Sequence, residues 1–308
     1  MEECVLKRIR AVAAFCVAFV LCFALVGCAA QQETYVPASK SAAVASPVIG
    51  EDGVLRVGVN TSNPPLAGLG TEKIIGIDVD FAAAIADELG LKLSVVDVGS
   101  DPGSALAEGS VDIVMGVDAT EADGTFWLTE AYLPTAVAVF STSSSAPVPV
   151  SGDGSTFAAQ VSSKSAWAIG NEFGLEALQS TANLPDAFAA LKAGEVTYAA
   201  ADAIIGLYAA HGQDMQVSIA ALLTEPSGYA VGVSAANADL QAAVGEAVSN
   251  LTGNGVIGVI EKKWLGTTID LSNTPMTAGV TFVEETVDEG SESEGEEAGE
   301  GEAEESAE

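Results

Sequence analysis

Short β-branched runs alternate with helical stretches through the middle of the chain, and this alternation is the feature that most limits its fold. A parallel strand has to be reached by a long return connection, usually a helix, so this order is typical of parallel sheets covered by helices. The predicted strands are Val54–Asn60, Leu91–Val98, Val111–Val117, Ser165–Gly170 and Val196–Ala201. The predicted helical segments are Ala82–Leu89, Ser104–Glu108, Gly174–Gln179, Pro185–Ala193 and Ala203–Ala209. Asp80 is placed to cap the first helix and Gly90 to end it.

The strands and helices form two groups of modest size, which predicts an α/β chain with two lobes rather than one wide sheet. In open parallel sheets, ligands collect beyond the carboxyl ends of the strands. The loops that follow the strands are therefore the candidate site.

Composition excludes several functions. The chain has 43 acidic residues against 11 basic ones and a formal charge of -32, which excludes nucleic-acid binding because a phosphate backbone requires clustered Lys and Arg. His211 is the only histidine, and all four cysteines lie in the first 28 residues. A zinc site built from several His or Cys, or a Cys–His nucleophile, is thereby excluded from the body of the chain. We expect no metal and no cofactor, although composition leaves open a hard-cation site built from oxygens.

Residues 1–27 have the pattern of an export signal. Basic residues come first, Ala11 to Val26 carry no charge, and small residues end the stretch. Leu25-Val26-Gly27-Cys28 resembles the bacterial lipobox, which implies cleavage before Cys28 and lipidation of that cysteine. The alternative is an uncleaved membrane anchor, because about 20 apolar residues can span a bilayer. Either segment places the body outside the cytoplasm on a membrane tether.

The segments at both ends of the body carry spacer-like compositions. Residues 28–50 are rich in Ala, Ser and Pro and are predicted to form a flexible tether. Residues 271–308 are predicted to form a linker and an acidic tail. Its last 25 residues hold 13 acidic and no basic residues, so it cannot bury enough apolar surface to become ordered. A calcium-binding tail is the alternative to a solvated one.

A series of short motifs resembles the amino-acid-type (family 3) extracellular solute-binding lipoproteins of bacterial ABC importers. No motif is specific by itself, and the resemblance rests on their joint order over residues 53–267. The motifs are Leu55-Arg56-Val57-Gly58-Val59, Asn63-Pro64-Pro65, Gly76-Ile77-Asp78-Val79-Asp80, Leu106 to Asp112, Thr120, Tyr132, Leu191 to Val196, Asp202 and Gly255 to Gly266.

The resemblance implies a two-lobed, type II periplasmic-binding-protein-like fold with the ligand cleft between the lobes. Lobe 1 would comprise 51–142 and 226–270, and lobe 2 would comprise 143–225. It implies a lipid-anchored monomer on the outer side of the cytoplasmic membrane that captures an amino acid or a related amine-bearing solute for an ABC permease. It implies binding and not catalysis.

Relatives in this family hold an α-amino acid with three devices. An Arg in a T-x-x-R motif binds the carboxylate, an Asp of lobe 2 binds the ammonium, and aromatic residues near N-P-P cover the side chain. This chain keeps the Asp as Asp202, but Asp123 stands at the arginine position and no aromatic residue flanks Pro64-Pro65. Arg56 is the only arginine of the body and lies inside a predicted strand. A lysine could substitute as a point charge, and Lys73 and Lys164 are the nearest in sequence, but neither aligns with a familiar clamp.

Seven residues are therefore candidates for ligand binding. They are Asn60, Asn63, Asp118, Thr120, Asp123, Glu172 and Asp202. A cleft lined by Asp118, Asp123 and Asp202 favours a cationic ligand that lacks a free carboxylate, or one whose carboxylate is bound by Thr120 and backbone N–H groups alone. Alternatively, Asp118 and Asp123 lie on a solvated loop, and Asp202 caps the helix that follows it.

Two other functions stay open at this point. The first is a surface interaction or sensor domain that has lost its small ligand, because the clamp arginine is missing. The second is an enzyme on the same scaffold, for which Glu172 or Asp118 would be the general acid or base.

Overall fold

A computed structural model describes residues 40–121 and 124–278. The chain divides into two units, Met1–Lys40 and Ser41–Glu308, and all described residues except Lys40 belong to the second. Cys28, the predicted export signal, most of the predicted acidic tail and Asp123 lie outside the described residues. Among the helices that are described, none has the length and apolar character needed to cross a membrane.

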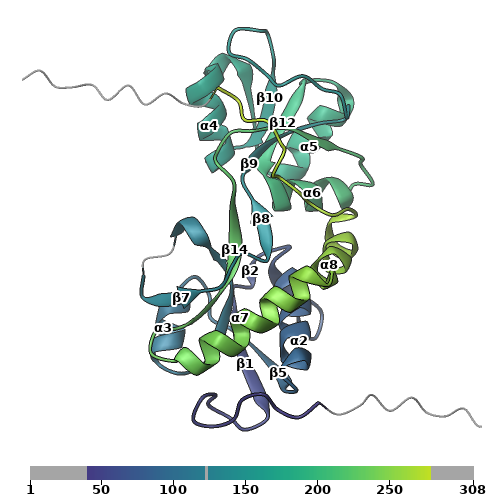
Figure 1. The fold of residues 1–308 in the computed structure, drawn as a ribbon. Helices are drawn as coiled ribbons and strands as arrows, with labels where there is room; N and C mark the ends of the chain where they lie inside the picture. Colours follow the sequence, from purple (N-terminus) through teal and green to yellow (C-terminus); the bar gives the residue numbers. More distant parts are fainter. Residues whose placement is uncertain (1–39, 122–123, 279–308) are drawn as a thin grey trace, which may run out of the picture. The chain divides into compact units, whose positions relative to one another are not determined.

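The first sheet has six strands (Figure 1). Their order is β5 (Lys92–Asp97), β1 (Val54–Val59), β6 (Ile113–Asp118), β14 (Ser227–Ser234) and β7 (Phe126–Leu128), and β8 (Leu133–Thr135) also pairs with β14. β1 runs parallel to β5 and β6, whereas β14 is antiparallel to β6. The helices that accompany this sheet are α2 (Ile77–Glu88), α3 (Pro102–Ala107), α7 (Ala238–Gly253) and α8 (Val256–Leu265). We call this part lobe 1, together with a small sheet of β2 (Ser62–Asn63), β3 (Ala67–Leu69) and β4 (Ile74–Ile75).

The second sheet has five strands and forms lobe 2. Their order is β11 (Leu178–Thr181), β10 (Phe157–Gln160), β12 (Tyr198–Asp202), β9 (Val137–Ser141) and β13 (Ser218–Leu222). Helices α4 (Lys164–Phe173), α5 (Leu184–Ala193) and α6 (Ala203–His211) pack against it, and two short 3₁₀ turns, Ala119–Glu121 in lobe 1 and Leu175–Ala177 in lobe 2, complete the elements. The two-lobed α/β fold class predicted from the sequence is confirmed.

The chain passes between the two sheets at two places inside this pair of lobes. The first passage is Ala136, between β8 and β9, so the second sheet begins six residues before the boundary expected after residue 142. This happens because Val137–Ser141 is an apolar run that pairs with both β12 and β13. The second passage is residues 223–226, between β13 and β14, which includes the boundary expected after residue 225.

The described parts of two segments that were expected to be spacers pack on the body. Ile49 is only 1% exposed, Ala43 N–H donates to the Leu89 carbonyl at 2.9 Å, and the Asn237 side chain donates to the Val48 carbonyl at 2.7 Å. The apolar residues of 44–49 therefore bind the end of the tether to lobe 1.

At the other end, residues 271–277 follow the edge of lobe 2. Leu222 N–H donates to the Pro275 carbonyl and Thr277 N–H donates to the Leu222 carbonyl, both at 2.9 Å. Leu271 is 3% exposed. The expected linker thus begins with an ordered segment that adds to strand β13.

The sequence prediction was wrong for 165–170, because Ser165–Gly170 lies in helix α4 and not in a strand. Of the helical segment expected at Gly174–Gln179, Leu175–Ala177 is a 3₁₀ turn, but its last two residues already belong to strand β11. Ser163 caps α4 by accepting from Ala166 N–H at 3.0 Å, and the buried residues Ala166, Ile169 and Phe173 recur with helical spacing. The true strand here, β10, was missed because Phe157–Gln160 is short and follows a Ser- and Gly-rich loop.

The predicted cap of helix α2 was also wrong. The helix begins at Ile77 after Gly76, with no side-chain cap. Asp80 instead accepts hydrogen bonds from Trp264 Nε1 at 2.7 Å and from Lys263 Nζ, which links α2 to α8.

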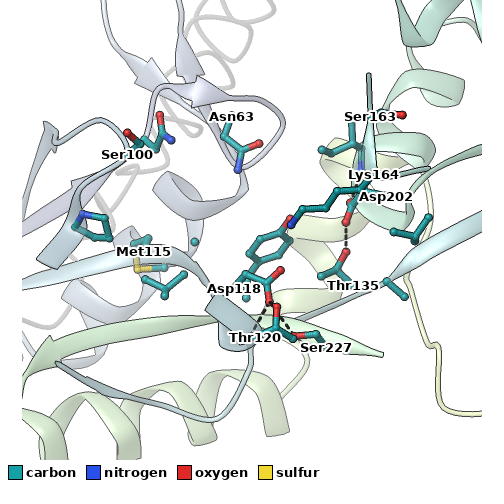
Figure 2. Close-up of a pocket in the computed structure, with 18 of the residues that line it drawn as sticks. Asn63, Ser100, Met115, Asp118, Thr120, Thr135, Ser163, Lys164, Asp202 and Ser227 are labelled. Carbon is teal, nitrogen blue, oxygen red and sulfur yellow. Dashed lines mark hydrogen bonds between the residues drawn. The ribbon is translucent and has the colours of Figure 1, made fainter. Parts of the chain in front are cut away.

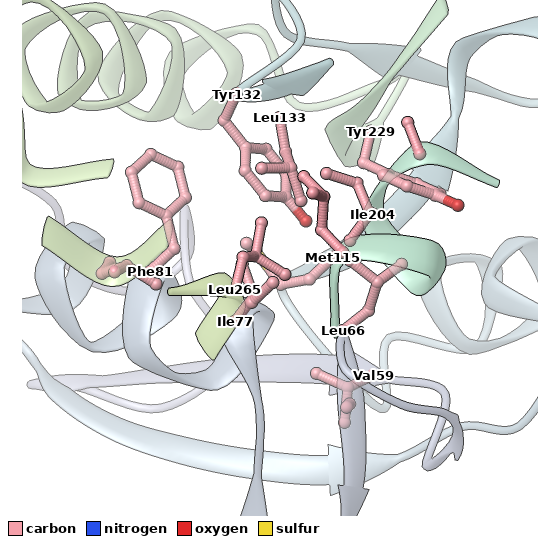
Figure 3. Packing of buried hydrophobic residues seen from close by; sticks show 14 of the residues in the cluster. Val59, Leu66, Ile77, Phe81, Met115, Tyr132, Leu133, Ile204, Tyr229 and Leu265 are labelled. Atoms are coloured by element: carbon pink, nitrogen blue, oxygen red, sulfur yellow. The ribbon is translucent and has the colours of Figure 1, made fainter. Parts of the chain in front are cut away.

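The largest cluster of buried hydrophobic residues includes residues of both lobes, such as Leu133 of lobe 1 and Ile204 of lobe 2 (Figure 3). Phe81 of α2 stacks on Tyr132 with ring centroids 4.8 Å apart, and Leu66 and Ile77 are buried beside them. The Tyr132 hydroxyl donates to the buried carboxyl group of Asp78 and accepts from Gly116 N–H at 3.1 Å. This network fixes strand β6 just before Asp118.

Candidate functional site

A cavity of about 950 Å³ opens between the two sheets, at the carboxyl ends of strands β1, β6 and β12, all three of which were predicted from the sequence. It is within the usual range for small-ligand pockets. Lobe 1 contributes the ends of β1 and β6 and the loop 98–103, and lobe 2 contributes the end of β12 and the start of α4 (Figure 2). The site thus lies where open α/β sheets bind ligands.

Five of the seven predicted site residues line this cavity. They are Asn60, Asn63, Asp118, Thr120 and Asp202. Glu172 does not line it, because it lies near the end of helix α4 and accepts a hydrogen bond from Thr277 Oγ1 at 2.8 Å. Its assignment to a loop followed from the wrong strand prediction for 165–170. Asp123 is outside the described residues.

Asp118 ends strand β6 and is held by three hydrogen bonds to one oxygen. Oδ1 accepts from Thr120 N–H at 2.9 Å, from Thr120 Oγ1 at 2.8 Å and from Ser227 Oγ at 2.9 Å (Figure 2). Partial burial acts to raise the pKa of Asp118, but these hydrogen bonds and the positive charge of Lys164 outweigh burial and lower it. Asp118 is therefore an ionised carboxylate, anchored from one side.

Asp202 ends strand β12 and faces the same cavity from lobe 2. Its Oδ1 accepts from Ile204 N–H at 2.9 Å and from Ile205 N–H at 3.1 Å, which caps helix α6, and its Oδ2 accepts from Thr135 Oγ1. Burial raises the pKa of Asp202, and the negative charge of Asp118 adds to the rise. Asp202 therefore both caps helix α6 and lines the cavity.

Lys164 is a site residue that the sequence analysis did not select. It is the first residue of α4, its side chain is exposed in the cavity, and it extends toward Asp118 of the other lobe (Figure 2). Ser162-Ser163-Lys164-Ser165 has the composition of a helix N-terminus and could have indicated Lys164. This signal was not used, because the following residues were assigned to a strand. Lys73, the other lysine considered, does not line the cavity.

Arg56 cannot act as the carboxylate clamp, because it does not line the cavity and is bound to other residues of lobe 1. Its Nη2 lies 2.6 Å from Asp112 Oδ1, its Nε donates to Asp112 Oδ2 at 3.2 Å, and its Nη1 donates to the Gly109 carbonyl at 2.8 Å. The arginine of the first motif therefore joins β1 to the turn before β6. Among the described residues that line the cavity, Lys164 is the one Lys or Arg.

The charge of the cavity is mainly negative. Its described lining holds four carboxylic acids, Asp101, Asp118, Asp202 and Glu225, against Lys164. Within 40–121 and 124–278 there is no group of three or more His, Cys, Asp or Glu that could hold a metal ion.

Apolar and aromatic side chains complete the lining. Val59, Met115 and Phe126 come from lobe 1, Leu184 and Ile205 come from lobe 2, and Tyr229 lies on β14 near the passage between the sheets. Phe126 and Tyr229 are aromatic residues that the sequence analysis missed, because it looked for such residues beside Pro64-Pro65. At those flanking positions Asn63 lines the cavity and Leu66 is buried in the core.

Solved structures share this fold. A substrate-binding protein of a polar amino acid ABC uptake transporter from Streptococcus thermophilus matches with a TM-score of 0.61 and 20% identity, over 70% of this chain and 88% of that one. The L-cystine solute receptor of Neisseria gonorrhoeae matches with a TM-score of 0.59 and 20% identity, over 70% and 94%. An ancestral cationic amino acid solute binding protein matches with a TM-score of 0.55 and 19% identity, over 69% and 96%.

A sequence search of curated proteins finds no match. The model of the bacterial extracellular solute-binding proteins, family 3, matches residues 55–267, which include both sheets and the cavity. The chain therefore belongs to the family 3 bacterial extracellular solute-binding proteins.

Proposed function

We propose that this solute-binding protein captures an amino acid or a related amine-bearing solute and presents it to an ABC permease. The observation that carries the proposal is the pair Asp118 and Asp202, which face one cavity from opposite lobes. A ligand ammonium between them would pair with both charges. The same step would draw the lobes together, since such clefts close by a change in a few hinge residues.

The acceptor sites on these carboxylates support the proposal. A carboxylate has about four lone-pair positions. On Asp202, Oδ1 accepts from Ile204 and Ile205 and Oδ2 accepts from Thr135, whereas on Asp118 the three hydrogen bonds from Thr120 and Ser227 all end on Oδ1. Each acid therefore keeps acceptor capacity for a ligand. Asn60, Asn63 and the other lining residues would then contact the remainder of the ligand.

Two structural neighbours carry names that agree with this ligand class, one as a polar amino acid and one as a cationic amino acid binding protein. The excess of acidic lining residues favours ligands with a second positive charge. We therefore rank basic amino acids first in the test.

Binding without catalysis is part of the proposal. Glu172, one of the two candidate acid–base groups, points away from the cavity to Thr277. Asp118, the other, has a lowered pKa, which suits a permanent anion better than a group that exchanges protons near neutral pH.

The proposal includes a monomeric protein held at the outer face of the cytoplasmic membrane by a lipid on Cys28. Incorporation of labelled fatty acid into the wild-type chain, and its loss in Cys28→Ala, would support the lipid anchor. An uncleaved and unlabelled chain in the membrane would favour the apolar segment as a permanent anchor.

Calorimetry and thermal unfolding with a panel of amino acids, amines and short peptides test the ligand class. A ligand at a hundredfold excess over its dissociation constant adds about 2.7 kcal/mol to the apparent stability, which is easily detected. Stabilisation by amine-bearing solutes, lost in Asp202→Asn, supports the proposal. No response to any member of the panel would instead favour an interaction or sensor domain.

A further inference from the structure

The cavity presents many acceptors and one cationic donor, and this imbalance assigns a role to Lys164. The residue stands at the start of α4 in lobe 2, with its side chain exposed to the cavity and extended toward Asp118 of lobe 1 (Figure 2). Its charge is one of the causes that lower the pKa of Asp118. The two lobes therefore present opposite charges to each other across the space where a ligand would enter.

The hydroxyl groups nearest to the two acids already donate their hydrogens. Thr120 Oγ1 and Ser227 Oγ donate to Asp118, and Thr135 Oγ1 donates to Asp202. A hydroxyl has one hydrogen to donate, so none of these three can donate to a ligand carboxylate without releasing an acid. One alternative from the sequence was that Thr120 and backbone N–H groups bind such a carboxylate, but Thr120 donates both its N–H and its hydroxyl to Asp118.

The other cations of the described chain do not replace Lys164. Lys164 is the one Lys or Arg of the described chain that lines the cavity, and Arg56 and Lys263 are bound elsewhere, to Asp112 and Asp80. A ligand carboxylate placed in this mainly negative space would be repelled everywhere except beside Lys164. A lysine ammonium binds a carboxylate as a point charge with three rotatable donors, so it needs no fixed planar geometry.

We propose that Lys164 binds the carboxylate of the ligand and so makes this cavity select amino acids over the corresponding amines. The inference rests on the proposed function, since it requires an amine-bearing ligand between Asp118 and Asp202. The ammonium of a zwitterionic ligand faces Asp118 and Asp202 while its carboxylate faces Lys164, so both charges of the ligand have a partner of opposite sign. The carboxylate contact thus comes from lobe 2 and from a lysine, and not from a lobe 1 arginine.

Calorimetric titration of the full chain, purified in a mild detergent, tests this with matched pairs of probes. Each pair contains an amino acid and the amine that differs from it only by the lost carboxylate: L-arginine and agmatine, L-lysine and cadaverine, L-leucine and 3-methylbutylamine. For the pair that binds, the wild type is expected to prefer the amino acid by about ten- to hundredfold, the range of a charge-assisted hydrogen bond. Lys164→Met is expected to abolish this preference and leave amine affinity unchanged or higher, whereas Lys164→Arg retains it.

Lys73→Met is the matched control, because it removes the same charge from an exposed lysine outside the cavity. It is expected to keep the preference of the wild type. The proposal is overturned if Lys164→Met keeps the preference, or if the wild type binds the amine as tightly as the amino acid. That second result leaves the proposed function intact, whereas a wild type that binds no probe overturns both. Because Lys164 is exposed, an unchanged thermal unfolding curve will verify that each variant is folded.

Discussion

Thr135 and Asp202 join the two lobes by a hydrogen bond between two residues that line the cavity. Thr135 ends β8 in lobe 1, Asp202 ends β12 in lobe 2, and the hydroxyl of the first donates to Oδ2 of the second. Thr135 is only 3% exposed, so the contact lies deep at the passage between the sheets. One carboxylate therefore takes part in a helix cap, a contact between lobes and the cavity lining.

Replacing Asp202 separates its charge from its capping role. Asparagine is as good an N-cap as aspartate, so Asp202→Asn is expected to change the unfolding temperature of the ligand-free protein little. The loss of the negative charge is expected to weaken binding of L-arginine or L-lysine by about ten- to hundredfold. A thermal scan measures the unfolding temperature, and calorimetric titration measures the affinity. Asp239→Asn, an exposed acid of helix α7 outside the cavity, is the control, and equal affinities for the two variants would contradict the role of Asp202.

The buried carboxyl group of Asp78 predicts a dependence of stability on pH. Burial raises the pKa of Asp78 from 3.8 to about 7, although the hydrogen bond from Tyr132 opposes this rise. Because the folded-state pKa is above the unfolded one, the stabilisation is fully present below about pH 4 and is lost as the pH rises to about 7. The size is at most about 4 kcal/mol, from 1.36 kcal/mol for each pKa unit.

Urea unfolding of the wild type and Asp78→Asn between pH 4 and pH 8 measures this contribution. Asparagine keeps an oxygen that can accept from Tyr132 but has no proton to lose, so the difference between the two curves isolates Asp78. Glu261, whose pKa burial also raises to about 7, is present in both proteins and cancels. Parallel curves would show that Asp78 does not titrate in this range.

Gly116 predicts a steric effect beside the same carboxyl group. Its φ is +69°, and a Cβ there would lie 2.4 Å from Asp78 Oδ2. Gly109 has nearly the same φ, +66°, but nothing lies within 4 Å of the Cβ position. Gly109→Ala is therefore expected to cost about 1 kcal/mol from the backbone alone, and Gly116→Ala about 1–3 kcal/mol more. Unfolding by urea provides the comparison, and equal losses would refute the close approach of Gly116 to Asp78.

Much of the fold could be predicted because its strands are apolar and well separated. Val54–Asn60, Leu91–Val98 and Val111–Val117 correspond to β1, β5 and β6, with small changes at their ends. The prediction failed at 165–170, where Ala-Trp-Ala-Ile resembles a strand locally although the buried positions of this segment repeat with helical spacing. Packing of this segment against the sheet of lobe 2 decides between a strand and a helix, and such packing cannot be seen in a short window of sequence.

The site could be predicted only in part for the same reason. Asp118 and Asp202 end predicted strands, so they could be named in advance, and both line the cavity. Lys164 was not selected, because it lies at the start of a helix that the sequence analysis missed. Tyr229 was not selected, because it lies in the cavity only through the antiparallel pairing of β14 with β6. Glu172 was selected on a misplaced loop and instead binds Thr277.

The segment 271–278 predicts that the end of the chain has two parts with different effects on stability. Removal of 279–308 is expected to leave thermal unfolding unchanged, since the described contacts of this region are made by residues 271–277. Removal of 271–308 takes away two backbone hydrogen bonds to Leu222, the hydrogen bond from Thr277 to Glu172 and the buried side chain of Leu271. Its expected cost is about 2–4 kcal/mol.

Thr277→Val refines this test, because it removes one hydroxyl and keeps the backbone contacts. Thr277 is 6% exposed and its hydroxyl lies 2.8 Å from Glu172 Oε2, so the variant is expected to lose about 1–2 kcal/mol. Glu172→Gln retains an acceptor for this hydroxyl and is expected to lose less. If instead the two truncations unfold at the same temperature, residues 271–278 do not hold the edge of β13 in solution. The hydrogen bond from Thr277 to Glu172 would then not explain why Glu172 lies outside the cavity lining.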